Sequence, residues 1–161
     1  MLTLSTKEVG ELIKLGQNHR DGPLWSFLVC SGLRLGEALG LRWSDYDDKT
    51  GQLQVRRQLR RSDGQYVLTE LKTKASRRTL RLTGTAREVL ERQREQQAAE
   101  WTAAGSKWED DETSRLLIFR APTGKPTNGP SINHRLTRLW QLPACRTCAS
   151  TTCATHTPAW P

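Results

Sequence analysis

The feature that most constrains this chain is the change from an apolar segment to a turn and then to an amphipathic segment, between residues 24 and 41. Residues 24–30 read L-W-S-F-L-V-C and are apolar enough to form a buried helix. A turn of small residues, 31–33, follows and delivers Arg34 directly out of that core element. An apolar stripe at helical spacing comes next, formed by Leu35, Ala38, Leu39 and Leu41. We therefore expect two helices joined by a tight bend, with an arginine at the bend.

Arg34 and Glu37 lie three residues apart, on the face beside the apolar stripe. A guanidinium that is braced by a carboxylate one turn later is oriented for a forked contact with a phosphate or a carboxylate. On periodicity alone, the simplest interpretation is an ordinary ion pair on the surface of a helix.

The longer pattern G-L-R-L-G-E-A-L-G-L-R-W-S-D is more specific, because it resembles the first arginine box of the tyrosine recombinases, the phage-integrase family. In that family the box arginine binds the scissile phosphate of DNA, and the matching residue here is Arg34. Glu37 matches the acidic residue that follows and would support the arginine. The resemblance implies a DNA integrase or recombinase that acts through a phosphotyrosyl intermediate, with no metal or nucleotide cofactor.

An alternation of apolar and polar residues begins at Leu53 and predicts strands. We expect three of them, at residues 53–59, 66–71 and 77–82, with hairpin turn chemistry at residues 62–65. The prediction is a small three-stranded antiparallel sheet with a strongly basic edge.

The run L-K-T-K-A-S-R-R-T-L-R-L also resembles the family, whose catalytic lysine lies at this hairpin and protonates the leaving 5′ oxygen. Lys72 matches that lysine, with Lys74 as the second candidate. Without the resemblance, a lysine in a turn would be interpreted as exposed surface. We expect Lys74, Arg77 and Arg78 to neutralise phosphates along the DNA backbone.

Helical patterns account for most of the remaining chain. The predicted helices cover residues 5–18, a segment that starts at Gly22-Pro23, residues 86–103, and a segment that starts at residue 130. Residues 116–119 are expected to be buried, residues 109–112 to form an exposed acidic loop, and His134 to lie on the surface. The expected fold is α+β and mostly helical, of the tyrosine recombinase type.

Size and charge favour a single DNA-binding domain. The chain has 161 residues, enough for one domain with a real core. Its net charge of +8 favours a polyanionic partner, most simply nucleic acid, and the resemblance implies that this partner is double-stranded DNA. We find neither an apolar leader at the N-terminus nor an apolar run that could span a membrane, so a cytoplasmic protein is expected.

The pattern changes abruptly after Trp140, so we divide the chain into a catalytic-domain part, residues 1–139, and an irregular tail, residues 140–161. The family requires a His-x-x-Arg helix near this point and then a tyrosine nucleophile. The two tyrosines of the chain, Tyr46 and Tyr66, lie far upstream. We therefore expect a truncated recombinase that is catalytically inactive.

The cysteines of the tail permit a zinc site as an alternative. Its four ligands would be Cys145, Cys148, Cys153 and His156. The two halves of this set are separated by little chain, so we favour an unstructured tail without a metal.

A frameshift would explain the tail, because its codons permit the sequence G-L-P-x-V-R-L-H-D-L-R-H one frame over, which resembles the second box of the family. The nucleotide sequence around the codons of Leu139 and Trp140 tests this hypothesis. Two other interpretations stay open at this point. The chain could be a non-catalytic DNA-binding module that interferes with an intact recombinase protomer, or a marginally folded pseudogene product.

Overall fold

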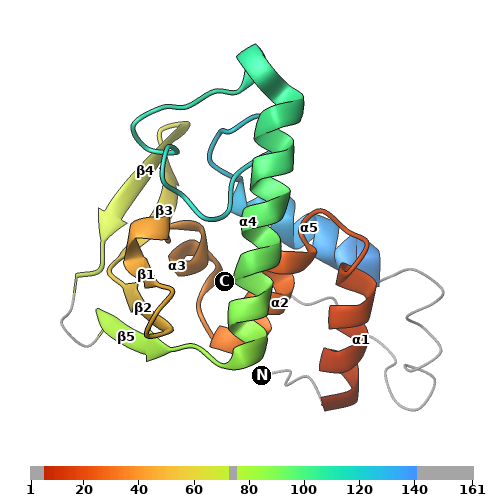
Figure 1. Cartoon of the computed structure of the whole chain (residues 1–161). Coiled ribbons are helices and arrows are strands. Elements are labelled where there is room, and N and C mark those ends of the chain that lie inside the picture. The colour runs from red at the N-terminus through yellow and green to blue at the C-terminus, as the bar shows by residue number, and fades with distance from the viewer. Residues whose placement is uncertain (1–5, 73–75, 141–161) are drawn as a thin grey trace.

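A long helix, α4 (Gly84–Ala104), separates a β-rich side from a group of shorter helices in the computed structural model (Figure 1). The structure describes residues 6–72 and 76–140. The shorter helices are α1 (Thr6–Gly16), α2 (Gly22–Ser31) and α5 (Gly129–Trp140). Helix α2 packs against both α1 and α4, so it forms the centre of the helical side.

Helices α1 and α2 meet at two glycines. A Cβ atom on Gly22 would lie 1.7 Å from the carbonyl oxygen of Gly16, so only glycine fits at the start of α2. Pro23 then occupies the first turn, where its missing N–H costs no helical hydrogen bond. The predicted start of α2 is correct, whereas α1 ends at Gly16, two residues before the predicted end.

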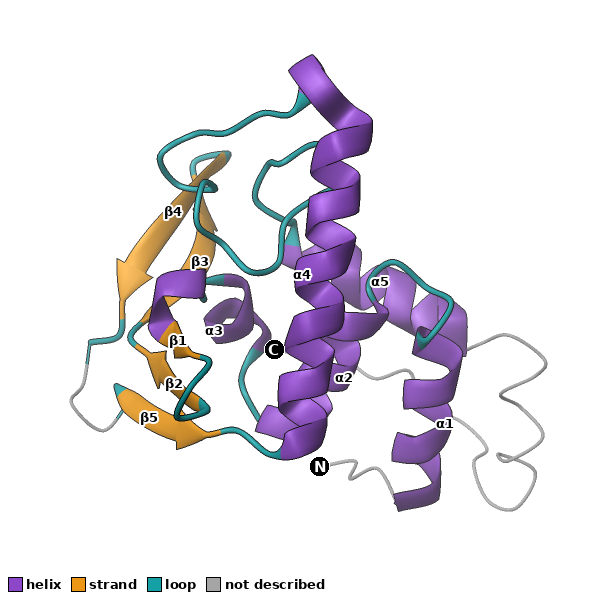
Figure 2. Cartoon of the chain, viewed as in Figure 1, coloured by secondary structure: helices purple, strands orange, loops and turns teal. Residues whose placement is uncertain are grey.

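The β-rich side contains two antiparallel ladders (Figure 2). The first is a three-stranded sheet in the order β1 (Tyr46–Asp47), β2 (Gln52–Val55), β5 (Arg78–Arg81). The second is a hairpin of β3 (Arg57–Ser62) and β4 (Gln65–Glu70). The α+β class and the small antiparallel sheet are therefore confirmed.

The strand pairing differs from the expected one in a specific way. The predicted strand at residues 53–59 is interrupted at Arg56, so its first half pairs with β5 and its second half pairs with β4. The alternation of apolar and polar residues continues across the break, which is why the pattern could not reveal it. The third strand of the sheet is β1, which lies outside the three predicted strands.

A short helix, α3 (Leu35–Leu39), packs on β3 and is followed by a single 3-10 turn, η1 (Trp43–Asp45). The core lies between these elements, α2 and α4. Its most deeply buried large side chains are Trp25, Phe27, Leu41, Leu53, Leu90, Leu117, Ile118 and Ile132. One core is therefore shared by α3 and the residues that follow it, the three-stranded sheet and α4.

The predicted long helix is confirmed, with two extra residues at its start and one at its end. Its last turns project beyond the core, where Trp101 is 61% exposed. A further 3-10 turn, η2 (Gly105–Lys107), ends it. Residues 117–119 are buried as expected, but Leu116 is 46% exposed and that part of the prediction is wrong. The backbone of Ile118 donates to the carbonyl oxygen of Leu41 over 3.0 Å, which fixes residues 117–119 beside the start of η1.

Several predictions fall on other parts of the chain. The acidic residues 109–112 and His134 are exposed, as expected. Lys74, the cysteine cluster and residues 141–161 of the proposed frameshifted tail lie outside the described residues, whereas Trp140 is the last residue of α5. Within residues 6–72 and 76–140, we find no group of three or more His, Cys, Asp or Glu side chains close enough to bind a metal ion. The helices of the same part include none that is long and apolar enough to cross a membrane.

Candidate functional site

The bend after α2 places Arg34 at the start of α3. Gly32 ends α2 in the left-handed conformation, with a φ of 65°, and its N–H donates to the carbonyl oxygen of Leu28 over 2.9 Å. Leu33 is buried and anchors the chain as it leaves the turn. Arg34 then adopts an extended conformation at the N-cap of α3. Because its backbone is fixed by the turn and the helix, the arginine leaves the core in one direction, and its side chain is 84% exposed.

Glu37 is the buried partner of this arginine. Only 1% of the surface of Glu37 is exposed, although its side chain ends in a carboxylate. Atom Oε2 accepts a hydrogen bond from the backbone N–H of Arg34 over 3.1 Å, which satisfies one of the free donors at the start of the helix. Atom Oε1 lies 3.5 Å from Arg34 Nη1. The predicted pairing of Arg34 with Glu37 is therefore present, but it is an interaction with a buried group and not a surface ion pair.

A second arginine, Arg78 on β5, binds the same carboxylate. Arg78 Nη2 donates to Glu37 Oε2 over 3.0 Å, and Nη1 lies 3.4 Å from Glu37 Oε1. Nη1 also donates to the carbonyl oxygen of Ser76 over 3.2 Å. We call Arg34, Glu37 and Arg78 the arginine–glutamate cluster. It joins α3 to the three-stranded sheet and carries a net charge of +1.

The two arginines keep Glu37 ionised. Burial raises the pKa of its carboxyl group, but the hydrogen bonds from the Arg78 side chain and the Arg34 backbone, together with both positive charges, outweigh burial. The net result is a pKa below the ordinary value. At neutral pH the cluster therefore contains one carboxylate and two guanidinium groups.

The same arrangement occurs once more, eight residues later. Asp45 is 6% exposed and its Oδ2 accepts from the backbone N–H of Arg42 over 2.9 Å. Arg57 on β3 donates to the same oxygen over 2.9 Å. Sequence reasoning overlooked this pair, although Arg-x-x-Asp at residues 42–45 repeats the spacing of Arg-x-x-Glu at residues 34–37. Each buried acid thus joins the start of a short helix to an arginine on a different strand.

Lys72 lies at the end of the β3–β4 hairpin and is exposed. It directly follows Leu71, whose N–H donates to the carbonyl oxygen of Arg56 over 3.0 Å and whose own carbonyl oxygen accepts from Arg77 Nε over 3.1 Å. These bonds hold the backbone before Lys72 close to the start of β5. Within the described residues, Lys72 makes no hydrogen bond or ion pair with the arginine–glutamate cluster.

Arg77 and Arg78 are neighbours with different surroundings. Arg77 is half exposed and pairs with the exposed Glu70 over 2.9 Å, whereas Arg78 turns to the buried Glu37. Both line an open hollow of about 450 Å³ between the end of β4 and the three-stranded sheet, together with Gln54, Val55, Arg56, Glu70 and Thr79. The hollow therefore has three arginines on its walls and one acidic residue.

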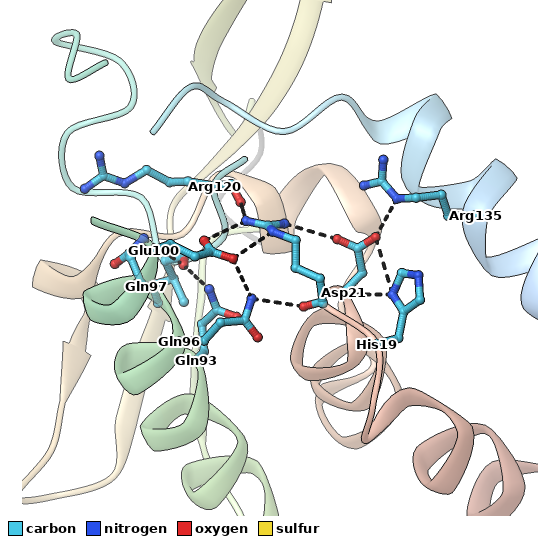
Figure 3. Close-up of polar contacts among 10 residues, drawn as sticks. His19, Asp21, Gln93, Gln96, Gln97, Glu100, Arg120 and Arg135 are labelled. Atoms are coloured by element: carbon cyan, nitrogen blue, oxygen red, sulfur yellow. Dashed lines mark hydrogen bonds and ion pairs between the residues drawn. The ribbon is translucent and has the colours of Figure 1, made fainter. Parts of the chain in front are cut away.

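A separate polar network fixes the helices behind the site, and no pattern in the sequence indicated it. Figure 3 shows its members converging from the turn before α2, from α4 and from α5, together with Arg120. The guanidinium of Arg20 donates to both carboxylate oxygens of Glu100, over 2.8 and 2.9 Å, and also to the carbonyl oxygen of Arg120. Asp21, buried at the start of α2, binds Arg135 of α5 over 2.5 Å. The network fixes α4 and α5 relative to α2, the helix that precedes the bend at Arg34.

Comparisons with known proteins agree on one family. The sequence profile described as the phage integrase family matches residues 3–148. A tyrosine recombinase XerC-like protein of Caldanaerobacter subterraneus subsp. tengcongensis is 30% identical over 139 residues, which cover 81% of this chain and 35% of that protein. The prophage integrase IntR of Escherichia coli K12 is 43% identical over 90 residues, or 56% of this chain and 21% of its own length. The chain thus spans about a third or less of these relatives.

Solved structures show the same fold at low sequence identity. The Tn1549 transposon integrase in complex with transposon right end DNA superimposes with a TM-score of 0.71 and 18% identity, over 86% of this chain and 45% of that one. The XerA recombinase superimposes with a TM-score of 0.63 and 17% identity, over 88% and 43% of the two chains. The fold described above therefore corresponds to less than half of these recombinase structures.

Proposed function

This chain belongs to the phage integrase family of tyrosine recombinases, and we propose that it forms the part of the catalytic domain that binds the DNA phosphate. In this proposal Arg34 binds the scissile phosphate, Glu37 supports it from behind, and Lys72 protonates the leaving 5′ oxygen. The observation that carries the proposal is the geometry of Arg34. It is the exposed guanidinium of a cluster with a net positive charge, on a backbone fixed by a left-handed turn.

The chemistry follows from this placement. Phosphoryl transfer depends mostly on positioning and on charge stabilisation at the phosphate oxygens. A guanidinium can donate two parallel hydrogen bonds to those oxygens, and a fixed backbone means that little reorganisation is needed when charge develops. An exposed lysine at the end of the neighbouring hairpin can reach a phosphate at the surface, and its ammonium group can donate a proton to the departing oxygen.

We propose that neither of the two tyrosines acts as the nucleophile. Tyr46 lies in β1 with 8% of its surface exposed, as part of the core. Tyr66 lies in β4, with the guanidinium of Arg61 6.0 Å from the centre of its ring. We propose that these 161 residues alone bind DNA without cleaving it. A nicked suicide substrate would trap any phosphotyrosyl intermediate, and a covalent protein–DNA adduct on a denaturing gel would contradict this proposal.

The binding experiment measures affinity for a fluorescently labelled duplex over a range of salt concentrations. Neutralising a phosphate releases counterions, so Arg34→Ala should weaken binding and lower the slope of log K against log salt by about one. Lys107→Ala is the control, because Lys107 is an exposed cation in the turn after α4. Equal losses in both variants would indicate generic electrostatic attraction and would contradict a specific role for Arg34.

The role of Lys72 needs a cleavage reaction, which a chimera can supply. In the chimera, residues 31–82 of this chain replace the matching segment of a full-length relative. A substrate with sulfur at the 5′ bridging position has a leaving group that needs no proton. It should restore cleavage to Lys72→Ala and not to Arg34→Ala. If the sulfur substrate restored cleavage to Lys74→Ala and not to Lys72→Ala, Lys74 would be the residue that protonates the leaving oxygen.

A further inference from the structure

We propose that Arg78 is a positioning residue for Arg34, and that it acts through Glu37 and makes no contact with DNA. The sequence alone predicted Arg78 to be one of several phosphate contacts along the basic edge of the sheet. The structure favours a different role, because the guanidinium of Arg78 is already engaged inside the protein. This inference rests on the proposed function, in which Arg34 binds the phosphate.

The first observation is the direction of Arg78 on its strand. Along β5, residues 78 and 80 face inward, whereas Thr79 and Arg81 are exposed. Leu80 packs against the core, so Arg78 shares its side of the strand with an apolar core residue. An arginine in that partly buried position favours a charged or hydrogen-bonding partner, because part of its guanidinium is removed from water. Glu37 provides that partner.

The second observation is the division of hydrogen bonds within the arginine–glutamate cluster. Both Nη atoms of Arg78 are directed to Glu37, and one of them also donates to the carbonyl oxygen of Ser76. The side chain of Arg78 is 34% exposed, against 84% for Arg34. The nearest guanidinium nitrogen of Arg34 lies 3.5 Å from Glu37 Oε1, a longer contact than the 3.0 Å from Arg78 Nη2 to Glu37 Oε2. Of the two guanidinium groups, Arg34 is therefore the one available to an incoming phosphate.

The charge balance explains why the second arginine is needed. A lone Glu37 would draw Arg34 into a two-pronged ion pair and neutralise it, and a neutral pair attracts phosphate poorly. Arg78 occupies the carboxylate with two contacts instead, so Glu37 can fix the start of α3 while Arg34 keeps its positive charge. The backbone hydrogen bond from Arg34 to Glu37 then sets the direction in which the side chain emerges.

The test uses Arg78→Lys, which keeps the charge but cannot hold both carboxylate oxygens in the same way. The matched control is Arg57→Lys, because Arg57 holds the buried Asp45 in the same arrangement at a different strand. We measure affinity for a labelled duplex in these variants, in Arg34→Ala, and in the double variants that combine Arg34→Ala with each lysine substitution. A thermal unfolding curve for every variant confirms that it is folded at the assay temperature.

The expected result is a several-fold loss of affinity in Arg78→Lys, which disappears when Arg34 is already alanine. Arg57→Lys should change affinity little in either background. A loss in Arg78→Lys that persists without Arg34 would show that Arg78 binds DNA directly and would overturn the inference. So would an unchanged affinity in Arg78→Lys. If Arg34→Ala itself has no effect, the proposed function fails and the inference fails with it.

A spectroscopic measurement separates positioning from general structural support. The ¹³C resonance of the Glu37 carboxyl group reports its protonation during a pH titration. In Arg78→Lys the midpoint should rise towards the ordinary value, because the two-pronged hydrogen bond that opposes burial is lost. In Arg57→Lys it should stay unchanged. Equal midpoints in all three proteins would contradict the proposed coupling between Arg78 and Glu37.

Discussion

Asp21 and Arg135 lie 114 residues apart in the sequence, and Arg135 Nε donates to Asp21 Oδ2 over 2.5 Å. The pair joins the start of α2 to α5, and Asp21 also binds Arg20 over 3.2 Å. Helix α5 begins at Gly129, where an added Cβ would lie 3.6 Å from the side chain of Leu35 in α3. The ion pair therefore supports the helix that packs against α3, at whose start Arg34 lies.

Replacing Asp21 with asparagine should destabilise the fold by roughly 2–3 kcal/mol, because a buried carboxylate that binds two guanidinium groups is lost. Urea unfolding followed by circular dichroism measures the change. The control is Asp48→Asn, since the ion pair between Asp48 and Arg94 is about half exposed and should contribute less than about 1 kcal/mol. Equal effects of the two substitutions would show that the buried network contributes no more than a surface ion pair.

Gly40→Ala should destabilise the protein by about 1–3 kcal/mol or more, because the new methyl group would collide with backbone. A Cβ on Gly40 would lie 2.8 Å from the Cα of Gln58 and 2.9 Å from its carbonyl carbon, and backbone cannot rotate away. Gly10→Ala in α1 is the matched control. A Cβ there has no neighbour within 4 Å, so alanine should stabilise the helix by about 0.5–1 kcal/mol. Differential scanning calorimetry of both variants would contradict this account if their melting temperatures moved in the same direction.

The bend, α3 and the long helix could be predicted because the information lies within a few neighbouring residues. Gly32 needs its left-handed conformation to end α2, and the spacing of Arg34 and Glu37 fixes one helical turn. The pairing of strands could not be predicted in the same way. Alternation indicates which residues form strands, but the break at Arg56 depends on which distant strand each half meets.

The polar contacts between distant segments were missed for the same reason. No pattern in the sequence links Asp21 to Arg135, and each residue alone resembles an ordinary surface charge. Arg78 was expected to face DNA together with Arg77, since both belong to one basic run. Their different surroundings follow from the alternation of β5, which turns one of two neighbouring arginines towards Glu37.

Gln97 on α4 connects three groups and should be sensitive to substitution. Its Oε1 accepts from the indole N–H of Trp43 over 2.8 Å, and its Nε2 donates to the carbonyl oxygens of Leu117 and Ile118 over 3.1 and 3.3 Å. Gln97→Leu should destabilise the protein by about 1–3 kcal/mol, because it leaves the indole N–H of Trp43 without its hydrogen-bond partner. Trp43→Phe combined with Gln97→Leu should cost less than the sum of the single changes. Strict additivity in urea unfolding would show that the two side chains are not coupled.

Glu37→Gln should flatten the dependence of stability on acid pH. The folded pKa of Glu37 lies below its ordinary value of 4.5, so its ionisation stabilises the folded state above that value. This contribution is lost as the pH falls from about 4.5 through the folded pKa, because the carboxyl group must then be protonated. Glu37→Gln should therefore be less stable than the wild type at neutral pH, and the difference should shrink in acid.

Urea unfolding measured between about pH 3 and pH 7 tests this expectation. Glu88→Gln is the control, because it removes the same charge from an exposed position on α4. Parallel curves for wild type and Glu37→Gln over the whole range would mean that the carboxylate is not preferentially ionised in the fold. In that case the two arginines would not stabilise a negative charge at Glu37, and the charge balance that leaves Arg34 available to a phosphate would be incorrect.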